Sequence, residues 1–390
     1  MSTGTEQGPH QGPAAGRGEG HGPAHPARQW TTWAPVVAVA VLAAGWGRHL
    51  PGPLLAVVGL CLIASVLSAV HHAEVVAHRV GEPYGSLVLA VAVTVIEVGL
   101  IVMLMAGGGG DASTYARDTV FAAFMITCNG VVGLSVLVAA LRRHRVAVFN
   151  AEGSGGALAT VTTLATMTLV LPTFTTGKPG HQFTGAQLAF AAVASLALYL
   201  LFVTVQTVRH RDYFLPVARD GGLADGPADS EEDHAPPPAA RAAWASLGLL
   251  LVALVAVVGN AKLVSPAIED GVESAGLPQA VVGVVIALMV LLPETLAAVR
   301  AARRGRVQTS LNLAYGSAIA SIGLTVPAIA LASIWLSGPL VLGLGAVHLV
   351  LLTLTAVVSA LTVVPGRATL LQGGVHLVLF AAFVFLSISP

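Results

Sequence analysis

Long apolar runs separated by short polar segments are the main pattern along this chain. Several of these runs reach or approach about 20 residues, the length that a helix needs to cross a bilayer. The pattern therefore predicts an all-α polytopic membrane protein with eleven membrane-spanning helices. Their expected positions are roughly residues 31–47, 53–71, 85–106, 118–141, 157–172, 185–208, 243–264, 279–300, 309–333, 339–363 and 370–388.

The composition agrees with a membrane protein and excludes several other classes. Of the 390 residues, 55% are hydrophobic and only 10% are charged, whereas soluble domains carry about 25% charged residues. The formal net charge is zero, so nothing indicates a nucleic-acid partner. Cys61 and Cys128 both lie in apolar runs and form no disulfide or metal-ligand pattern.

The distribution of basic residues gives each span a direction. With the N-terminus in the cytoplasm, 15 of the 19 Lys and Arg residues fall in cytoplasmic segments. The four on the outer side are Arg48, Arg117, Lys178 and Lys262. Because cytoplasmic segments of membrane proteins carry the excess of Lys and Arg, we expect a cytoplasmic N-terminus, a C-terminus outside and an odd number of spans.

A long polar segment at residues 209–242 divides the chain. It is rich in Pro and locally acidic, and the topology makes it a cytoplasmic loop. It separates a first half, residues 51–208, from a second half, residues 243–390, each with five predicted spans. Residues 29–50 form one extra N-terminal helix, after a Gly-, Pro- and His-rich tail at residues 1–28 that we expect to be disordered. Because five is odd, two related halves enter the membrane from opposite sides, as in inverted-repeat transporters with a substrate site near the midplane.

One carboxylate lies deep in a predicted span of each half. Glu97 and Glu294 both lie past the middle of the second span of their half. A charge at the bilayer centre costs at least a few kcal/mol, and a carboxyl group avoids that cost by taking up a proton or pairing with a cation. Oxygen ligands suit hard cations such as Ca²⁺ and Na⁺. The two acids are therefore the leading candidates for a shared cation and proton site.

Two carboxylates are too few for an ion such as Ca²⁺, which takes about six to eight oxygen ligands. Pro293 frees a backbone carbonyl one turn before Glu294, and Thr94 lies one turn before Glu97 on the same helix face. The next span of each half carries small polar residues, followed by Gly133-Leu134 and Gly323-Leu324, whose superposition aligns Thr127 with Ser317. Helix packing is the alternative role for these small polar residues. The further ligand candidates are Thr127, Asn129, Asn312, Ser317 and Ser321.

Glu74 lies in a cluster with three histidines at the predicted cytoplasmic end of the second span. A solvated helix end accounts for this cluster, and a point of access for protons or cations is the alternative role for Glu74. His348 and His376 lie inside late spans, where we interpret them as buried histidines rather than proton relays.

Two stretches around the acids resemble the repeats of a known family. The stretch "HHAEVVAHRVGEPYGSLVLAVAVTVIEVGLI" resembles the first α-repeat of the calcium/cation antiporter superfamily, and "LLPETLAAVRAARRGRVQTSLNLAYGSAIASIGLTVPAIA" resembles the second. The segment "QTVRHRDYFL", followed by an acidic loop, is similar to the bacterial calcium/proton antiporter branch. The resemblance implies two central acids, here Glu97 and Glu294, completed by small polar residues of the following helices. Many members carry Asn-Ala before each acid, whereas this chain has Val95-Ile96 and Leu292-Pro293.

The expected function is secondary active antiport at the cell membrane, in which Ca²⁺, and in addition Na⁺ or K⁺, is exported in exchange for H⁺ by alternating access. No cofactor is expected beyond the transported ions. The expected partners are inorganic cations and the lipid bilayer, and a homo-oligomer is compatible with the sequence. A sodium/calcium exchanger is the nearest alternative. A membrane-embedded enzyme is disfavoured because the spans contain no HExxH, no GxGD-like pair and no His/Asp cluster, and a passive channel would show no proton coupling.

Overall fold

The computed structural model describes residues 30–48, 50–81, 84–107, 113–142, 146–215, 238–336 and 338–390. The predicted disordered tail at residues 1–28 and most of the predicted cytoplasmic loop at residues 209–242 lie outside the described residues. Within the described residues, each predicted span is present as one helix or as joined helical segments.

The helices follow the predicted order along the chain. After α1 (Trp30–Gly45), the first half contains α2 (Gly52–Val80), α3 (Tyr84–Gly107), the joined segments α4 (Tyr115–Met125), η2 (Ile126–Val131) and α5 (Val132–Arg142), then α6 (Ala151–Ala165), η3 (Thr166–Val170), α7 (Leu171–Phe174), α8 (Gly185–Thr204) and η4 (Val205–Arg209). After η5 (Arg211–Phe214), the second half contains α9 (Ala240–Ser274), α10 (Ala280–Arg303), α11 (Val307–Ala332), α12 (Ala346–Val363) and α13 (Leu370–Ile388). Ten helical units of the described residues are long and apolar enough to cross a membrane, and α1 is a shorter apolar helix of 16 residues. The predicted all-α polytopic fold is therefore confirmed.

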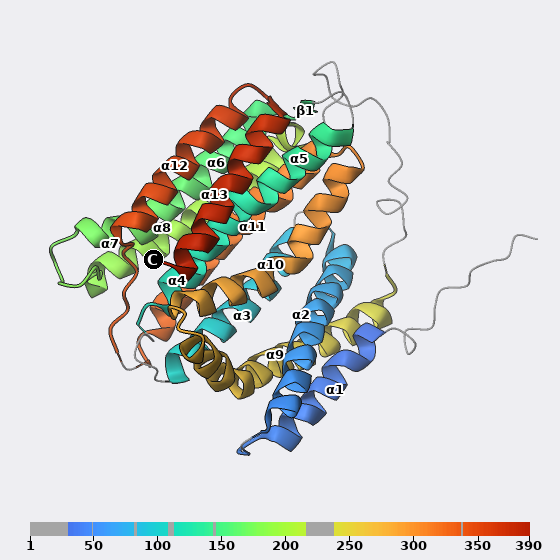
Figure 1. The fold of residues 1–390 in the computed structure, drawn as a ribbon. Helices are drawn as coiled ribbons and strands as arrows, with labels where there is room; N and C mark the ends of the chain where they lie inside the picture. The colour runs from blue at the N-terminus through green and yellow to red at the C-terminus, as the bar shows by residue number, and fades with distance from the viewer. Residues whose placement is uncertain are drawn as a thin grey trace, which may run out of the picture.

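The two halves pack against each other reciprocally. The second helix of each half, α3 or α10, contacts the third helical unit of the other half, α11 or α4–η2–α5. The last helices behave in the same way, because α8 packs on α11 and α13 packs on α5. The first helices, α2 and α9, pack on each other. This exchange of equivalent contacts is the pattern that two related five-helix halves produce, and it brings α3, α10 and α11 together inside the molecule (Figure 1).

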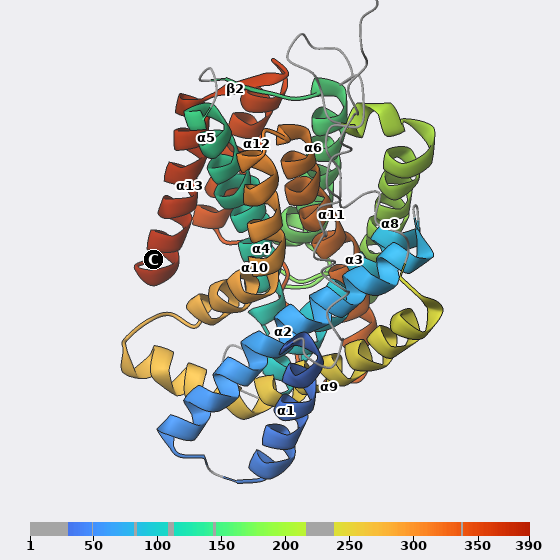
Figure 2. The same ribbon diagram turned by 90° about the vertical axis from the view of Figure 1, so that its right-hand side faces the viewer.

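The helices α1, α2 and α9 form a group at one side of the molecule, and α2 crosses the other helices obliquely (Figure 2). At about 1.5 Å per residue, the 29 residues of α2 and the 35 of α9 give helices about 44 and 52 Å long. Both exceed the roughly 30 Å hydrocarbon core of a bilayer. An oblique path or a protruding end is how such long helices fit a membrane.

A proline in α1 explains how this extra helix is attached to its neighbours. Pro35 has no backbone N–H, so the carbonyl of Thr31, four residues earlier, has no donor within the helix. Two side chains of α2 supply the missing bonds, because Ser68 Oγ donates to that oxygen at 2.6 Å and His72 Nε2 lies 3.1 Å from it. Asn260 of α9 donates to the carbonyl of Ala38 at 3.1 Å. Hydrogen bonds to the α1 backbone thus hold the three helices together.

Two helices extend well beyond their predicted ends. The predicted second span ends at residue 71, but α2 continues to Val80. The predicted seventh span ends at residue 264, but α9 continues through Pro266 to Ser274. The apolar run marks only the part of a helix that fits in the bilayer, and the polar turns after it carry the helix further.

The tenth span begins later than predicted. Residues 339–345 form neither a helix nor a strand, and α12 starts at Ala346. The backbone N–H groups of Val341, Gly343 and Leu344 donate to Ser113, His181 and Leu169 at 2.9–3.0 Å, which replaces the bonds that a helix would have made. A short antiparallel pair, β1 (Val146–Val148) with β2 (Arg367–Thr369), was also not predicted.

Candidate functional site

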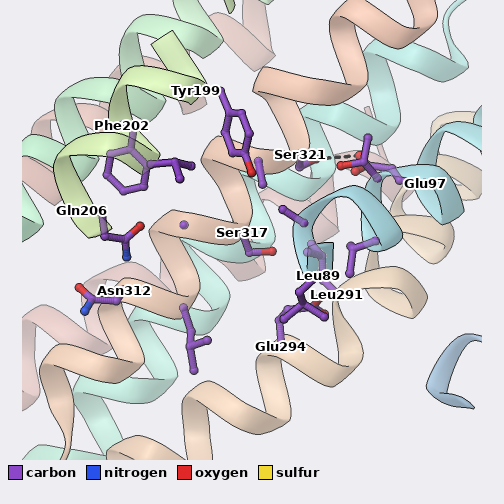
Figure 3. Close-up of a pocket in the computed structure, with 17 residues that line it drawn as sticks. Leu89, Glu97, Tyr199, Phe202, Gln206, Leu291, Glu294, Asn312, Ser317 and Ser321 are labelled. Carbon is purple, nitrogen blue, oxygen red and sulfur yellow. Dashed lines mark hydrogen bonds between the residues drawn. The ribbon is translucent and has the colours of Figure 1, made fainter. Parts of the chain in front are cut away.

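A cavity of about 180 Å³ lies between the two halves. Its wall is formed by α3, α8 with η4, α10 and α11, so both halves contribute (Figure 3). Six of the predicted site residues line it: Thr94, Glu97, Glu294, Asn312, Ser317 and Ser321. The structure therefore brings together the two acids of the two halves and four of the six predicted polar neighbours.

Helix α11 makes room for the cavity because its facing side chains are small. The lining residues of α11 recur one turn apart, with Gly316 and Ala320 on one row and Ser317 and Ser321 on the next. Large side chains at these positions would fill the space. In Figure 3, Ser317 lies between Asn312 and Ser321 along α11 and points toward the helices that carry the two acids.

Glu97 is almost fully buried in the wall formed by α3. Its side chain is 3% exposed, and Ser321 Oγ donates a hydrogen bond to Glu97 Oε1 at 2.7 Å (Figure 3). Thr94, one turn earlier on α3, is also buried and lines the same cavity. A hydroxyl donor close to a carboxylate stabilises the ionised form, and bonds to charged groups are stronger than neutral ones.

Glu294, on α10, has a carboxyl oxygen without a hydrogen-bond donor among the described residues. Its Oε2 atom is buried and has no hydrogen-bond partner within the described part of the chain. Glu74 and Glu97 both lie close enough for their charges to act on the Glu294 carboxyl group. Glu74 is an exposed residue of α2, which packs on α10, and it does not line the cavity. A buried carboxyl oxygen without a donor is costly unless a proton or a cation occupies it.

Two predicted ligand candidates lie elsewhere. Thr127 and Asn129 are buried in η2, a π-helical stretch, and neither lines the cavity. Thr127 Oγ1 donates to the backbone carbonyl of Ala123 at 2.7 Å. Asn129 Nδ2 donates to Thr355 Oγ1 at 2.8 Å, and its Oδ1 lies 3.1 Å from His376 Nδ1. Both side chains therefore make hydrogen bonds between packed helical segments and do not face the cavity.

Sequence reasoning missed the part of the wall that α8 and η4 provide. Tyr199, Phe202 and Gln206 all line the cavity. Gln206 lies near the predicted end of a span, where a polar residue normally indicates the membrane boundary rather than a site. The aromatic residues were hidden among the apolar residues of the span. Only the packing of α8 on α11 brings these three side chains to the site.

The cavity offers oxygen atoms and little else for chemistry. Carboxylates, hydroxyls and amides from both halves line it, and the rest of the wall is apolar. The described residues contain no group of three or more His, Cys, Asp or Glu side chains that could hold a metal ion. The arrangement therefore suits a hard cation bound by a few oxygens, or protons on the same carboxyl groups.

Comparisons with known proteins agree with this picture. The family described as "Sodium/calcium exchanger protein" matches residues 52–208 and 245–389. The chain is 44% identical over 333 residues to a protein of Sinorhizobium fredii named as an ionic transporter, y4hA, covering 84% of this chain and 87% of that protein. It is 35% identical over 324 residues to the sodium-potassium/proton antiporter ChaA of Escherichia coli, covering 82% of this chain and 85% of that protein.

Solved structures share the fold. The structure of native YfkE has a TM-score of 0.67 at 16% identity and covers 92% of this chain and 100% of its own. The structure of the H⁺/Ca²⁺ exchanger CAX has a TM-score of 0.66 at 16% identity and covers 91% of this chain and 86% of its own.

Proposed function

Because this chain belongs to the sodium/calcium exchanger protein family, in the calcium/cation antiporter superfamily, we propose that it exchanges cations for protons at the cavity between α3, α10 and α11. The coarse function, cation antiport by a multi-pass membrane protein, comes with the family and its relatives. The proposal concerns the site and the ions. The observation that carries it is the meeting of Glu97 and Glu294, one from each half, in a single cavity.

The two acids are proposed to bind either cations or protons. When both are ionised they repel each other across the cavity, and the low dielectric of the membrane interior strengthens that repulsion. Protons or a cation remove it. Since the same oxygens serve both, loading one species releases the other, and this competition is the basis of exchange. Thr94, Ser317 and Ser321 are proposed to complete the cation site, and Glu74 to assist access to Glu294.

The proposed ions are Ca²⁺, Na⁺ and K⁺. The Escherichia coli relative is named for sodium, potassium and protons, which supports the monovalent ions. Hard oxygen ligands and two carboxylates also suit Ca²⁺. We propose the plasma membrane as the location, with the N-terminus in the cytoplasm and the C-terminus outside, from the distribution of basic residues. Export would then follow from the inward proton gradient, with the two halves alternating access to the site.

Reconstituted vesicles with an internal pH dye test this function. A preset pH gradient should collapse when Ca²⁺, Na⁺ or K⁺ is added outside, and the ion that acts at the lowest concentration identifies the main substrate. Collapse in Na⁺-free buffer on adding Ca²⁺ would separate proton-driven from sodium-driven exchange. If no cation moved protons, or if cations crossed without any proton movement, cation/proton antiport would be wrong.

A further inference from the structure

The segment that follows α8 folds back against one end of the cavity. η4 continues α8, and η5 (Arg211–Phe214) then turns toward α6 and α11. Phe214 is buried, and its backbone carbonyl accepts a hydrogen bond from Asn312 Nδ2 at 2.6 Å. Because Asn312 lines the cavity, the segment that leads out of the first half is fastened directly to the cavity wall.

Both polar atoms of the Asn312 side chain are in use. Its Oδ1 accepts from Gln308 Nε2 at 2.9 Å, and Gln308 Oε1 accepts from the backbone N–H of Asn150 at 2.7 Å. Asn150 is the N-cap of α6. This series of hydrogen bonds thus joins α6, α11 and η5. While these bonds are intact, the Asn312 carboxamide oxygen is already bonded to Gln308.

Aromatic packing supports the same contact. The rings of Phe214 and Phe202 meet edge to face, with centroids 5.9 Å apart and an interplanar angle of 88°. Phe202 and Gln206 both line the cavity, and η4, the segment that carries Gln206, packs on η5. Phe202, Gln206 and Asn312 appear together in Figure 3, away from the two acids. One end wall of the cavity is therefore backed by η5.

We propose that the contact of Phe214 with Asn312 and Phe202 is a latch that keeps this end of the cavity closed. Opening the latch would move η5 off the wall, admit water and cations between Phe202 and α11, and free Asn312 to turn. The part that the latch plays in transport rests on the proposed antiport, whereas its control of access to the cavity does not.

A glycine outside the cavity allows the latch to be weakened without changing a lining residue. The backbone carbonyl of Tyr213, next to Phe214, lies directly against Gly153 of α6, so a Cβ at Gly153 would collide with it. Gly156 lies on the same helix, and a Cβ there would meet no described atom within 4 Å. Gly153→Ala is therefore the test variant and Gly156→Ala its matched control.

The experiment measures how fast a thiol in the cavity reacts with a small cationic methanethiosulfonate reagent in the purified full-length protein. Leu313, an apolar lining residue, is changed to Cys as the reporter, with Cys61 and Cys128 both replaced by Ala. Gly153→Ala should raise the labelling rate roughly three- to tenfold, the change expected when the closed state loses one hydrogen bond. Gly156→Ala should label at the rate of the parent.

Equal labelling rates in the Gly153→Ala and Gly156→Ala proteins would overturn the latch. If Gly153→Ala does not yield folded protein, Phe214→Ala removes the ring packing on Phe202 and must raise the rate in the same direction, or the proposal is wrong. Labelling requires no transport, so a failure of exchange in the vesicle assay and a failure of the latch are separate results.

Discussion

Two buried polar regions of this protein differ in how many of their polar atoms have hydrogen-bond partners. In the cavity, Glu97 has one hydrogen bond from Ser321, and Glu294 Oε2 has none from the described residues. In the cluster between η2, α12 and α13, His376 bonds Asn129 on one ring nitrogen and Thr362 on the other, at 3.1 Å each. A buried polar group with complete partners serves packing, whereas one next to space and with unmet bonding capacity is available to a ligand.

The contrast is sharper because the two regions occupy related places in the two halves. Gly133 of α5 lies against His376 of α13, and Gly323 of α11 lies against Tyr199 of α8. The first contact supports the closed polar cluster, and the second supports the wall of the cavity. A π-helical stretch interrupts the helix before Gly133, whereas α11 continues unbroken to Gly323. Equivalent glycines thus lie against a closed polar cluster at Gly133 and against the cavity wall at Gly323.

The largest effect is expected from removing the charge of either acid. Glu97→Gln or Glu294→Gln should lower cation/proton exchange by about a hundredfold or more, because a buried charge that contacts its partner is worth several kcal/mol. The measurement is cation-dependent collapse of a pH gradient in vesicles with equal amounts of protein. Wild-type exchange in both variants would remove the cavity acids from the mechanism.

Ser321→Ala should have the next largest effect. It removes the hydrogen bond that Ser321 donates to Glu97. Charge-assisted bonds are worth about 1.5–3 kcal/mol, so the apparent cation affinity should fall roughly ten- to a hundredfold. Ser310→Ala is the matched control on α11, since Ser310 bonds Ser135 and the carbonyl of Ala298 rather than a cavity acid. Equal affinity in both variants would contradict the role of Ser321.

Asn129→Ala should change stability rather than exchange. The variant leaves His376 and Thr355 without their Asn129 bonds, at a cost of about 1–3 kcal/mol per unsatisfied buried group. The melting temperature of the purified protein should fall, and exchange per folded molecule should stay near wild type. Loss of exchange with an unchanged melting temperature would place Asn129 in the transport site after all.

The smallest effect is expected at the attachment of α1. Ser68→Ala removes one of two bonds to the Thr31 carbonyl, and His72 still contacts the same oxygen. The expected loss is about 0.5–1.5 kcal/mol of stability, with exchange unchanged. Thermal unfolding and vesicle exchange measured on the same preparation check this, and a selective loss of exchange would show that α1 takes part in switching.

The sequence was sufficient for the order and approximate positions of the helices because a bilayer demands long apolar runs. It was insufficient where backbone N–H groups bond carbonyls that are distant in the sequence. Residues 339–345 are apolar but not helical, since Gly343 fits tightly against Thr173 and His181 and donates a hydrogen bond to the carbonyl of His181. The apolar pattern also did not predict the helix ends at Val80 and Ser274.

The two acids that line the cavity stand out in the sequence because a charge deep in an apolar span is costly and is retained mainly where a protein uses it. The polar residues around the two acids could not be predicted, because the direction of each side chain depends on the local helix geometry. Thr127 and Ser317 align in the sequence, yet η2 places Thr127 in packing contacts while α11 turns Ser317 into the cavity. Gln206 reaches the cavity only through the packing of α8.

The central claim is that protons and cations compete for Glu97 and Glu294. The most direct test adds Ca²⁺, Na⁺ or K⁺ to the purified protein in weakly buffered detergent solution and measures the protons released. The wild-type protein should release protons as the cation saturates the site, and the Glu97→Gln/Glu294→Gln double variant should release none. Undiminished release from the double variant, or saturable cation binding to the wild type without release, would contradict the account.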